Sequence, residues 1–146
     1  MKSKNDILSR AVELAVQYHK GQYDKSGEPY ILHCFRVMLK GKTVEEMITG
    51  VLHDIVEDTI VDEEMLRREG FDEEILFAVK ALTKIESESN DAYLERVMSS
   101  RLASRVKLND LEDNMNLMRL KEISPKDTER LNKYVNSYRR ITQSLY

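Results

Sequence analysis

The chain has few of the features that mark secreted or membrane-bound proteins. It contains one cysteine, Cys34, which excludes an internal disulfide framework, suits a reducing cytosol and is best interpreted as a small buried apolar residue. No apolar run reaches the roughly 18 residues that a membrane span needs. The opening segment, MKSKNDILSR, has no apolar core and so does not resemble a signal peptide. We therefore expect a cytoplasmic protein that binds no membrane.

A large excess of either charge is also missing. The net charge is −3 over 146 residues, of which 41% are apolar and 34% are charged. Proteins that bind nucleic acid usually carry a basic face, and nothing in the overall composition points to one. The same balance is typical of a folded globular chain, and the length suits one domain over residues 1–146.

Residues that interrupt helices are rare, because the whole chain has two prolines and five glycines. Apolar residues recur at intervals of three and four, which is the period of an amphipathic helix, and no strand pattern is present. Asn5 or Asp6 can cap a first helix, and Pro29 and a capping box at Thr43 predict helices over 29–40 and 43–58. We also expect a long helix over about 92–120 and a last helix capped by Ser124. We predict an all-α fold, a single compact domain of about six or seven helices.

The predicted helix over 43–58 carries an unusual polar group in its segment GVLHDIVEDT, residues 50–59. Its apolar residues form one broad stripe, and at about 100° per residue His53 points nearly opposite to that stripe. A solvated polar face would explain this, yet from His53 to Glu64 there are six acids and no lysine or arginine. Gly50 costs about 1 kcal/mol in mid-helix, so it can make room for a ligand or a neighbouring helix.

A bound metal ion would remove the repulsion among these acids. The chain offers His53 and the adjacent Asp54, a second histidine, His33, in the preceding helix, and Asp110 in the run VKLNDLEDNM. Each of them alone is more often a cap or a satisfied core group. Together, two imidazoles and two carboxylates from three helices form a reasonable cage for one divalent cation. This donor set suits Mn²⁺, Fe²⁺ or Zn²⁺ better than Mg²⁺.

The same four residues resemble a known signature. They match the His…His-Asp…Asp pattern of the HD superfamily of metal-dependent phosphohydrolases. Three segments around them are similar to the hydrolase domain of RelA/SpoT homologues: YHKGQYDKSGEPYILH (18–33), VLHDIVEDT (51–59) and RVKLNDLEDNM (105–115). Those enzymes, including small stand-alone versions, remove the 3′-pyrophosphate of (p)ppGpp with Mn²⁺. The resemblance spans most of the chain and implies an HD-type domain with this activity, without the family's separate synthetase domain.

The resemblance also implies roles for individual residues. The four signature residues would bind Mn²⁺ or another divalent transition metal, which would activate a water molecule and polarise a phosphoryl oxygen. Glu57 and Asp58 match the acidic pair beside that water, and a carboxylate pair this close should have one raised pKa. Lys25, Ser26 and Asn114 match residues that contact the nucleotide.

Basic residues near these segments are candidates to hold substrate phosphates: Lys20, Lys25, Arg36 and Lys107. An ordinary surface position is an equally good interpretation of each of them.

Four positions depart from the family pattern. Cys34 replaces a proline, Leu111 replaces a basic residue, and Asn116 replaces an arginine. Asp24 stands where the family has an arginine that stacks on guanine. Because Asp24 cannot stack, we expect weaker binding of ppGpp or a different nucleotide, unless the neighbouring Tyr23 supplies the stacking surface.

Three functions are compatible with this pattern. The first is (p)ppGpp 3′-pyrophosphohydrolase. The second is an HD-type phosphatase that acts on another phosphorylated nucleotide, such as NADPH or a nucleoside monophosphate. The third is a non-catalytic helical domain that binds a metal or a nucleotide. Glu57 speaks against the third, because a purely structural metal cage needs no spare carboxylate beside it.

Overall fold

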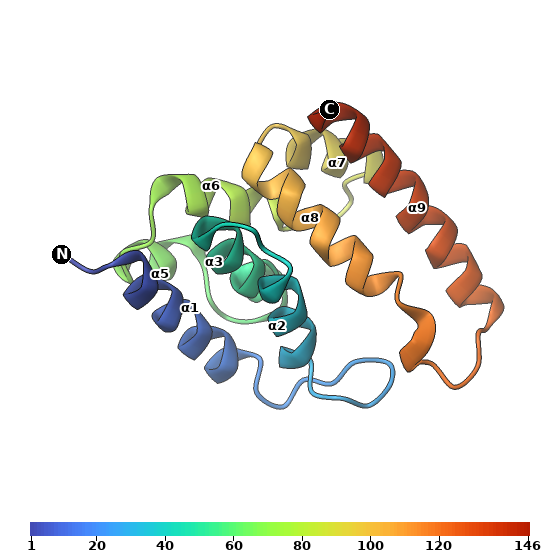
Figure 1. Ribbon diagram of the computed structural model, residues 1–146, viewed down its shortest axis with the longest axis horizontal. Helices are drawn as coiled ribbons and strands as arrows, with labels where there is room; N and C mark the ends of the chain where they lie inside the picture. Colours follow the sequence, from blue (N-terminus) through green and yellow to red (C-terminus); the bar gives the residue numbers. More distant parts are fainter.

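The structure, a computed structural model, describes residues 1–146 as helices joined by short connections (Figure 1). Nine α-helices and one 3₁₀ helix follow one another: α1 (Lys4–Tyr18), α2 (Ile31–Leu39), α3 (Val44–Leu52), α4 (Ile55–Asp58), α5 (Glu63–Arg68), α6 (Glu73–Leu82), α7 (Asn90–Met98), α8 (Arg101–Asn114), η1 (Leu117–Arg119) and α9 (Pro125–Leu145). The only strand-like contact is an isolated bridge between Tyr23 and Pro29. The all-α prediction is confirmed, with more and shorter helices than the six or seven expected.

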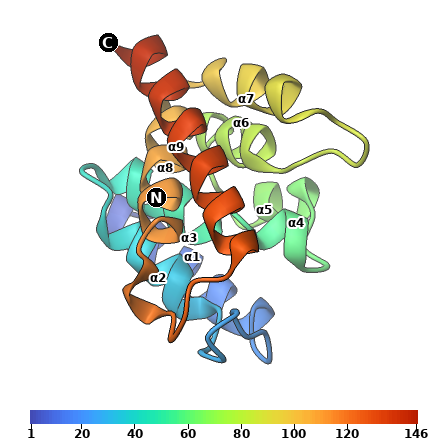
Figure 2. The ribbon, with the colours of Figure 1, turned by 90° about the vertical axis from the view of Figure 1, so that its right-hand side faces the viewer.

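Helix α3 lies at the centre of the packing and contacts α1, α2, α6 and α8. Its buried residues Ile48, Val51 and Leu52 belong to one apolar cluster that also includes Val37 of α2 and Val106 of α8. Removing this apolar surface from water is the main source of stability. Helix α9 packs against α8 and runs alongside it (Figures 1 and 2). No helix combines the length and the apolar character needed to cross a membrane.

The predicted continuous helix over 43–58 is wrong in one respect that matters for the site. It is broken at His53 and Asp54, so that α3 ends at Leu52 and α4 begins at Ile55. The backbone of Asp54, with φ −106° and ψ 1°, leaves the helical conformation. His53 is therefore not on an outward face but is only 2% exposed, because the helix breaks there and α8 packs against α3.

Other helix boundaries also differ from the sequence prediction. The region 92–120 is not one helix, because Ser99 ends α7 and the side chain of Ser100 accepts a hydrogen bond that caps α8. The cap of the first helix is Ser3, two or three residues before the expected Asn5 or Asp6. The cap at Ser124 is confirmed. Short polar caps thus divide segments whose apolar period continues across the break.

Gly50 makes room for a neighbouring helix. A Cβ atom added there would lie 3.2 Å from the Cα of Met38 and 3.3 Å from the carbonyl oxygen of Val37, both backbone atoms of α2. Glycine therefore lets α2 and α3 approach closely, which brings His33 of α2 near the end of α3.

Two connections meet at one end of the molecule. The loop between α1 and α2 and the connection between α8 and α9 lie at the same end in both views (Figures 1 and 2). They are joined where the hydroxyl of Ser26 donates to the carbonyl oxygen of Arg119 at 3.4 Å. This end of the molecule carries the pocket described below.

Candidate functional site

The four residues expected to bind a metal are brought together from three parts of the chain. His33 lies on α2, His53 and Asp54 lie at the break between α3 and α4, and Asp110 lies on α8. The Nε2 atom of His33 is 3.0 Å from Asp110 Oδ1, and the Nε2 atom of His53 is 2.9 Å from Asp54 Oδ2 and 3.3 Å from Asp110 Oδ1. Two imidazole nitrogens and two carboxylates therefore converge on one small volume.

The hydrogen bonding of the two ring nitrogens of His53 indicates whether this cluster fits a cation. Its Nδ1 atom lies 2.6 Å from the carbonyl oxygen of Gly50, which can only accept, so the neutral ring carries its proton there. Its Nε2 atom is buried and makes no hydrogen bond although carboxylate oxygens are close to it. The ligand atoms of His33, His53 and Asp54 lie within 4.8 Å of one another. The donor set and this unpaired nitrogen fit a divalent transition metal.

Two residues that the sequence analysis did not single out contact this cluster. Asp113 is 2% exposed, and its Oδ2 lies 2.6 Å from His33 Nδ1. Although burial alone would raise the pKa of Asp113, hydrogen bonds from His33 and Arg36 lower it to about 2. The hydroxyl of Tyr30 donates to Asp54. Each lies three residues from a ligand, Asp113 after Asp110 and Tyr30 before His33, a spacing that could have drawn attention to both.

Three basic residues proposed as phosphate ligands are placed elsewhere. The ammonium of Lys107 pairs with Asp110 at 2.8 Å, and although burial lowers the pKa of Lys107, this carboxylate raises it further, so the lysine stays charged. The guanidinium of Arg36 bonds Asp113 at 2.7 Å. Neither these two residues nor the exposed Lys20 line the pocket beside the cluster. Lys107 and Arg36 instead balance the charge of buried carboxylates.

The acidic pair lies at the solvent edge of the cluster. Carboxylate oxygens of Glu57, Asp58 and Asp54 lie within 4.8 Å of one another. One oxygen of Glu57 accepts the backbone N–H of Lys84 at 2.8 Å, which orients the carboxylate. Partial burial and the charges of Asp54 and Glu57 raise the pKa of Asp58 to about 6. The expected raised pKa in this pair is thus found at Asp58.

A pocket of about 320 Å³ adjoins the His–Asp cluster, which is the group of His33, His53, Asp54 and Asp110. Tyr30 and Asn114 line it, and both also bond to residues of the cluster, Tyr30 to Asp54 and the amide of Asn114 to Asp110 at 3.1 Å. Tyr30 and Asn114 therefore form a shared wall between the pocket and the cluster. Lys25 and Ser26, which were expected at a nucleotide site, line the same pocket. A ligand held there would have one end beside the His–Asp cluster.

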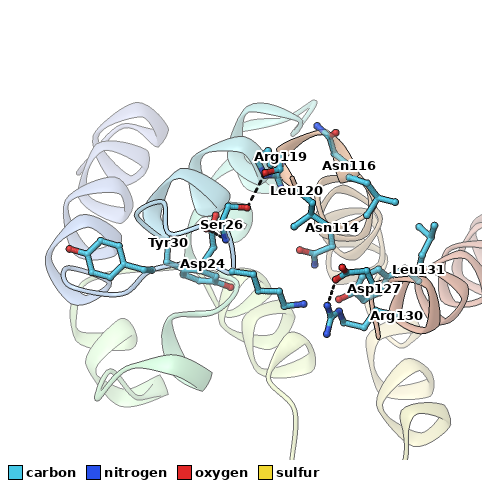
Figure 3. Close-up of a pocket in the computed structure, with 14 residues that line it drawn as sticks. Asp24, Ser26, Tyr30, Asn114, Asn116, Arg119, Leu120, Asp127, Arg130 and Leu131 are labelled. Atoms are coloured by element: carbon cyan, nitrogen blue, oxygen red, sulfur yellow. Dashed lines mark hydrogen bonds and ion pairs between the residues drawn. The ribbon is translucent and has the colours of Figure 1, made fainter. Parts of the chain in front are cut away.

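The pocket has three cationic side chains, Lys25, Arg119 and Arg130, and two acids. Asp127 is engaged within the protein, because it accepts the backbone N–H of Ser124 at 2.9 Å and pairs with Arg130. Figure 3 shows this pair on one side of the pocket and the bond between Ser26 and Arg119 on the other. Arg119 and Arg130 were not foreseen here, because no pattern in the sequence indicates that they meet the loop at Lys25.

Asp24 is also engaged within the protein. Its Oδ1 atom accepts the backbone N–H groups of Ser26 at 2.9 Å and of Glu28 at 3.0 Å. These bonds fold the loop between α1 and α2 in the manner of an Asx turn. The adjacent Tyr23 lines the pocket and is 67% exposed. At position 24 the loop therefore has no cation to stack on a base, and the exposed ring of Tyr23 is the stacking surface that it offers.

The other departures from the family pattern have structural explanations. Cys34 is fully buried, and burial raises the pKa of its thiol to about 12, so it is an inert core residue as expected. Leu111 is 2% exposed and belongs to the core. Asn116 caps the 3₁₀ helix by accepting the N–H of Met118 at 3.2 Å. None of the three disturbs the convergence of the His–Asp cluster.

Comparison with known proteins agrees with this architecture. The family model described as "HD domain" matches residues 11–142. A guanosine-3′,5′-bis(diphosphate) 3′-pyrophosphohydrolase of Borreliella burgdorferi is 45% identical over 82 residues, which is 53% of this chain and 12% of that protein. A protein of the same name from Aquifex aeolicus is 36% identical over 120 residues, 74% of this chain and 17% of that protein. A GTP pyrophosphokinase of Myxococcus xanthus is 38% identical over 95 residues, 62% of this chain and 12% of that protein.

The solved structures include a metazoan ortholog of SpoT that hydrolyzes ppGpp. It superposes with a TM-score of 0.74 at 21% identity, covering 99% of this chain and 86% of that one. At this identity the likeness establishes a shared fold. The chain spans less than a fifth of the length of the curated relatives described above.

Proposed function

Because this chain belongs to the HD domain family, we propose that it is a metal-dependent phosphohydrolase that removes the 3′-pyrophosphate of (p)ppGpp. The observation that carries the proposal is the shared wall of Tyr30 and Asn114, which joins a cluster of metal-binding side chains to a cationic pocket. The names of the Borreliella burgdorferi and Aquifex aeolicus relatives support (p)ppGpp as the substrate.

The resident metal in this proposal is Mn²⁺, held by His33, His53, Asp54 and Asp110. The mixture of imidazole and carboxylate donors supports a divalent transition metal in general, and Mn²⁺ is the finer part of the proposal. When bound, the ion would activate a water molecule and polarise a phosphoryl oxygen of the substrate.

The acidic pair, Glu57 and Asp58, would carry out the proton transfers of the reaction. Glu57, with one oxygen fixed by the N–H of Lys84, has its other oxygen free to take a proton from the attacking water. The new bond joins the oxygen of this water to the phosphorus attached at the 3′ position, and the bond from that phosphorus to the 3′ oxygen breaks. The 3′ oxygen takes up a proton, and Asp58, whose carboxylate lies within 4.8 Å of those of Asp54 and Glu57, would be placed to exchange it. The products are the nucleoside 5′-diphosphate or triphosphate and pyrophosphate.

The pocket would hold the rest of the nucleotide. Lys25, Arg119 and Arg130 supply positive charge for the 5′-phosphates. The exposed ring of Tyr23 would stack on the base, in place of the arginine that the family has at position 24.

A second candidate is a phosphatase that acts on another phosphorylated nucleotide. The bonding of Asp24 within its own loop favours it, because the pocket then has no cation at the position where the family reads guanine. Hydrolysis of such a substrate would use the same His–Asp cluster and the same acidic pair.

A panel of nucleotides offered to the Mn²⁺-loaded protein tests both candidates. ppGpp, NADPH and nucleoside monophosphates would be supplied separately and the products identified by chromatography, with the Glu57→Gln variant as the inactive control. We expect GDP and pyrophosphate from ppGpp. Turnover of another nucleotide without turnover of ppGpp would favour the second candidate, and metal binding with no turnover at all would contradict both.

A further inference from the structure

Asp113 occupies an unusual place, since a buried carboxylate connects a metal-binding histidine with two arginines. Its Oδ2 atom is 2.6 Å from His33 Nδ1 and 3.6 Å from a guanidinium nitrogen of Arg119. Its Oδ1 atom accepts Nε–H of Arg36 at 2.7 Å. Arg119 also donates to the backbone carbonyl of Asp113 at 3.1 Å. Both oxygens of the carboxylate therefore have partners. Its direction is fixed by His33 and Arg36 of α2 on one side and by Arg119 of η1 on the other.

This geometry determines which nitrogen of His33 can bind a metal. An ionised carboxylate accepts hydrogen bonds and cannot donate one, so the neutral ring must carry its proton on Nδ1. The lone pair is then on Nε2, the atom that faces Asp110 Oδ1 at 3.0 Å and Asp54 Oδ2 at 3.9 Å. His53 obtains the same tautomer from a different acceptor, the carbonyl of Gly50.

We propose that Asp113 is a positioning residue that sets the tautomer and direction of His33 for metal binding, and that Arg36 holds Asp113 in place. The proposal rests on the metal site described under the proposed function, and it is independent of which nucleotide is the substrate. Asp113 does not touch the metal position itself. It acts through the hydrogen bond to His33, as carboxylates behind metal-binding histidines commonly do.

The Asp113→Asn substitution tests this role, because it keeps the shape of the side chain and removes one of its two acceptor oxygens. The Asp113→Asn side chain has one acceptor oxygen and one NH₂ group, while His33 Nδ1–H and Arg36 Nε–H are both donors. If the oxygen faces Arg36, the NH₂ group faces His33, and the ring proton moves to Nε2, where it blocks the metal. If the oxygen faces His33, the NH₂ group opposes Arg36. We expect the dissociation constant for Zn²⁺, measured by competition with a chelator, to rise by about 10–100-fold.

The matched control is Glu112→Gln, which removes the neighbouring carboxylate on the exposed side of α8. It should leave the Zn²⁺ affinity unchanged. Arg36→Gln should weaken Zn²⁺ binding less than Asp113→Asn, because the bond between Asp113 and His33 is retained. Equal Zn²⁺ affinity in Asp113→Asn and the wild-type protein would overturn the proposal.

A second measurement uses the wild-type protein, so that it does not depend on whether a variant folds. ¹⁵N NMR of the histidine side chains in the Zn²⁺-loaded protein should show His33 protonated at Nδ1 and bound to the metal through Nε2. Protonation of His33 at Nε2, or metal binding through Nδ1, would overturn the proposal. Neither measurement uses a nucleotide, so the proposed substrate can fail while this inference stands.

Discussion

The His–Asp cluster and the adjoining pocket lie side by side but are built in different ways. The side chains of His33, His53 and Asp110 are buried, come from packed helices or their ends, and each contacts a partner that fixes its direction. The pocket is lined mainly by the loop after α1, by the η1 segment and by the first turns of α9, and two of its charged residues, Asp127 and Arg130, pair with each other.

This difference shows which residues of the site can be replaced at little cost and which cannot. A ligand in a packed core cannot be replaced without leaving a cavity or an unpaired charge. A loop residue such as Asp24 can differ from the family because its new hydrogen bonds are local. Loops on a rigid scaffold commonly carry the variable part of a site in this way.

The largest expected effect on activity is at the border of the two regions. Glu57→Gln keeps the shape of the side chain and its bond from Lys84, and it removes the basic oxygen. We expect kcat to fall by about 10²–10⁴-fold with little change in KM, since a general base acts on the transition state. Glu64→Gln, a surface acid of the same run, is the control. A wild-type rate in Glu57→Gln would remove this residue from proton transfer.

A smaller effect is expected in the pocket. Tyr23→Ala should raise KM for ppGpp roughly five-fold, because stacking of one exposed ring contributes about 1 kcal/mol. Asp24→Asn should leave KM nearly unchanged, since its oxygen still accepts from the N–H groups of Ser26 and Glu28. Asp24→Arg loses both bonds and should raise KM despite its charge. A lower KM in Asp24→Arg would show that the family's arginine can act here and that the local bonds of Asp24 matter little.

The close approach of α2 and α3 at Gly50 should matter for stability. Gly50→Ala places a Cβ atom 3.2–3.3 Å from backbone atoms of α2, which cannot rotate away as a side chain can. Overpacking of this kind costs about 1–3 kcal/mol, against a gain of about 1 kcal/mol in helix propensity. We expect a lower free energy of unfolding in denaturant titration and weaker metal binding, because His33 moves with α2. Unchanged values in both measurements would mean that α2 shifts freely.

The smallest effect concerns the pH dependence of the metal-free protein. The pKa of Asp58 is raised to about 6 by burial and by Asp54 and Glu57, so between its unfolded value near 4 and pH 6 the folded state binds more protons. Its contribution to stability therefore falls as pH rises through this window. In the presence of chelator, Asp58→Asn should raise the Tm relative to wild type at pH 7 and not at pH 4. An equal change in Tm at both pH values would contradict this.

The sequence predicted that four residues converge better than it predicted the helices that bring them together. His33, His53, Asp54 and Asp110 stood out because polar groups in apolar helices are costly unless something pairs with them. The break between α3 and α4 did not, because the apolar period continues through His53 and Asp54 and gives no stop signal. As a result, His53 was expected on an outward face.

The contacts that the sequence did not reveal depend on tertiary packing. The hydrogen bond that His33 donates to Asp113 joins residues 80 positions apart and exists only because α2 packs against α8. Arg119 and Arg130 reach the pocket only because the connection before α9 folds back against the loop at Ser26. Periodicity reports which face of a helix is apolar, and it does not report which helices meet.

The most direct test of the account is the metal content of the purified protein, measured by elemental analysis after loading with Mn²⁺ and removal of free ions. The account predicts one ion per chain in the wild-type protein, and one in Glu57→Gln. It predicts none in His53→Ala or Asp110→Ala, because each removes one of the converging ligands and leaves the others without a complete site. Full occupancy in both His53→Ala and Asp110→Ala would contradict the central claim that these side chains form one metal centre.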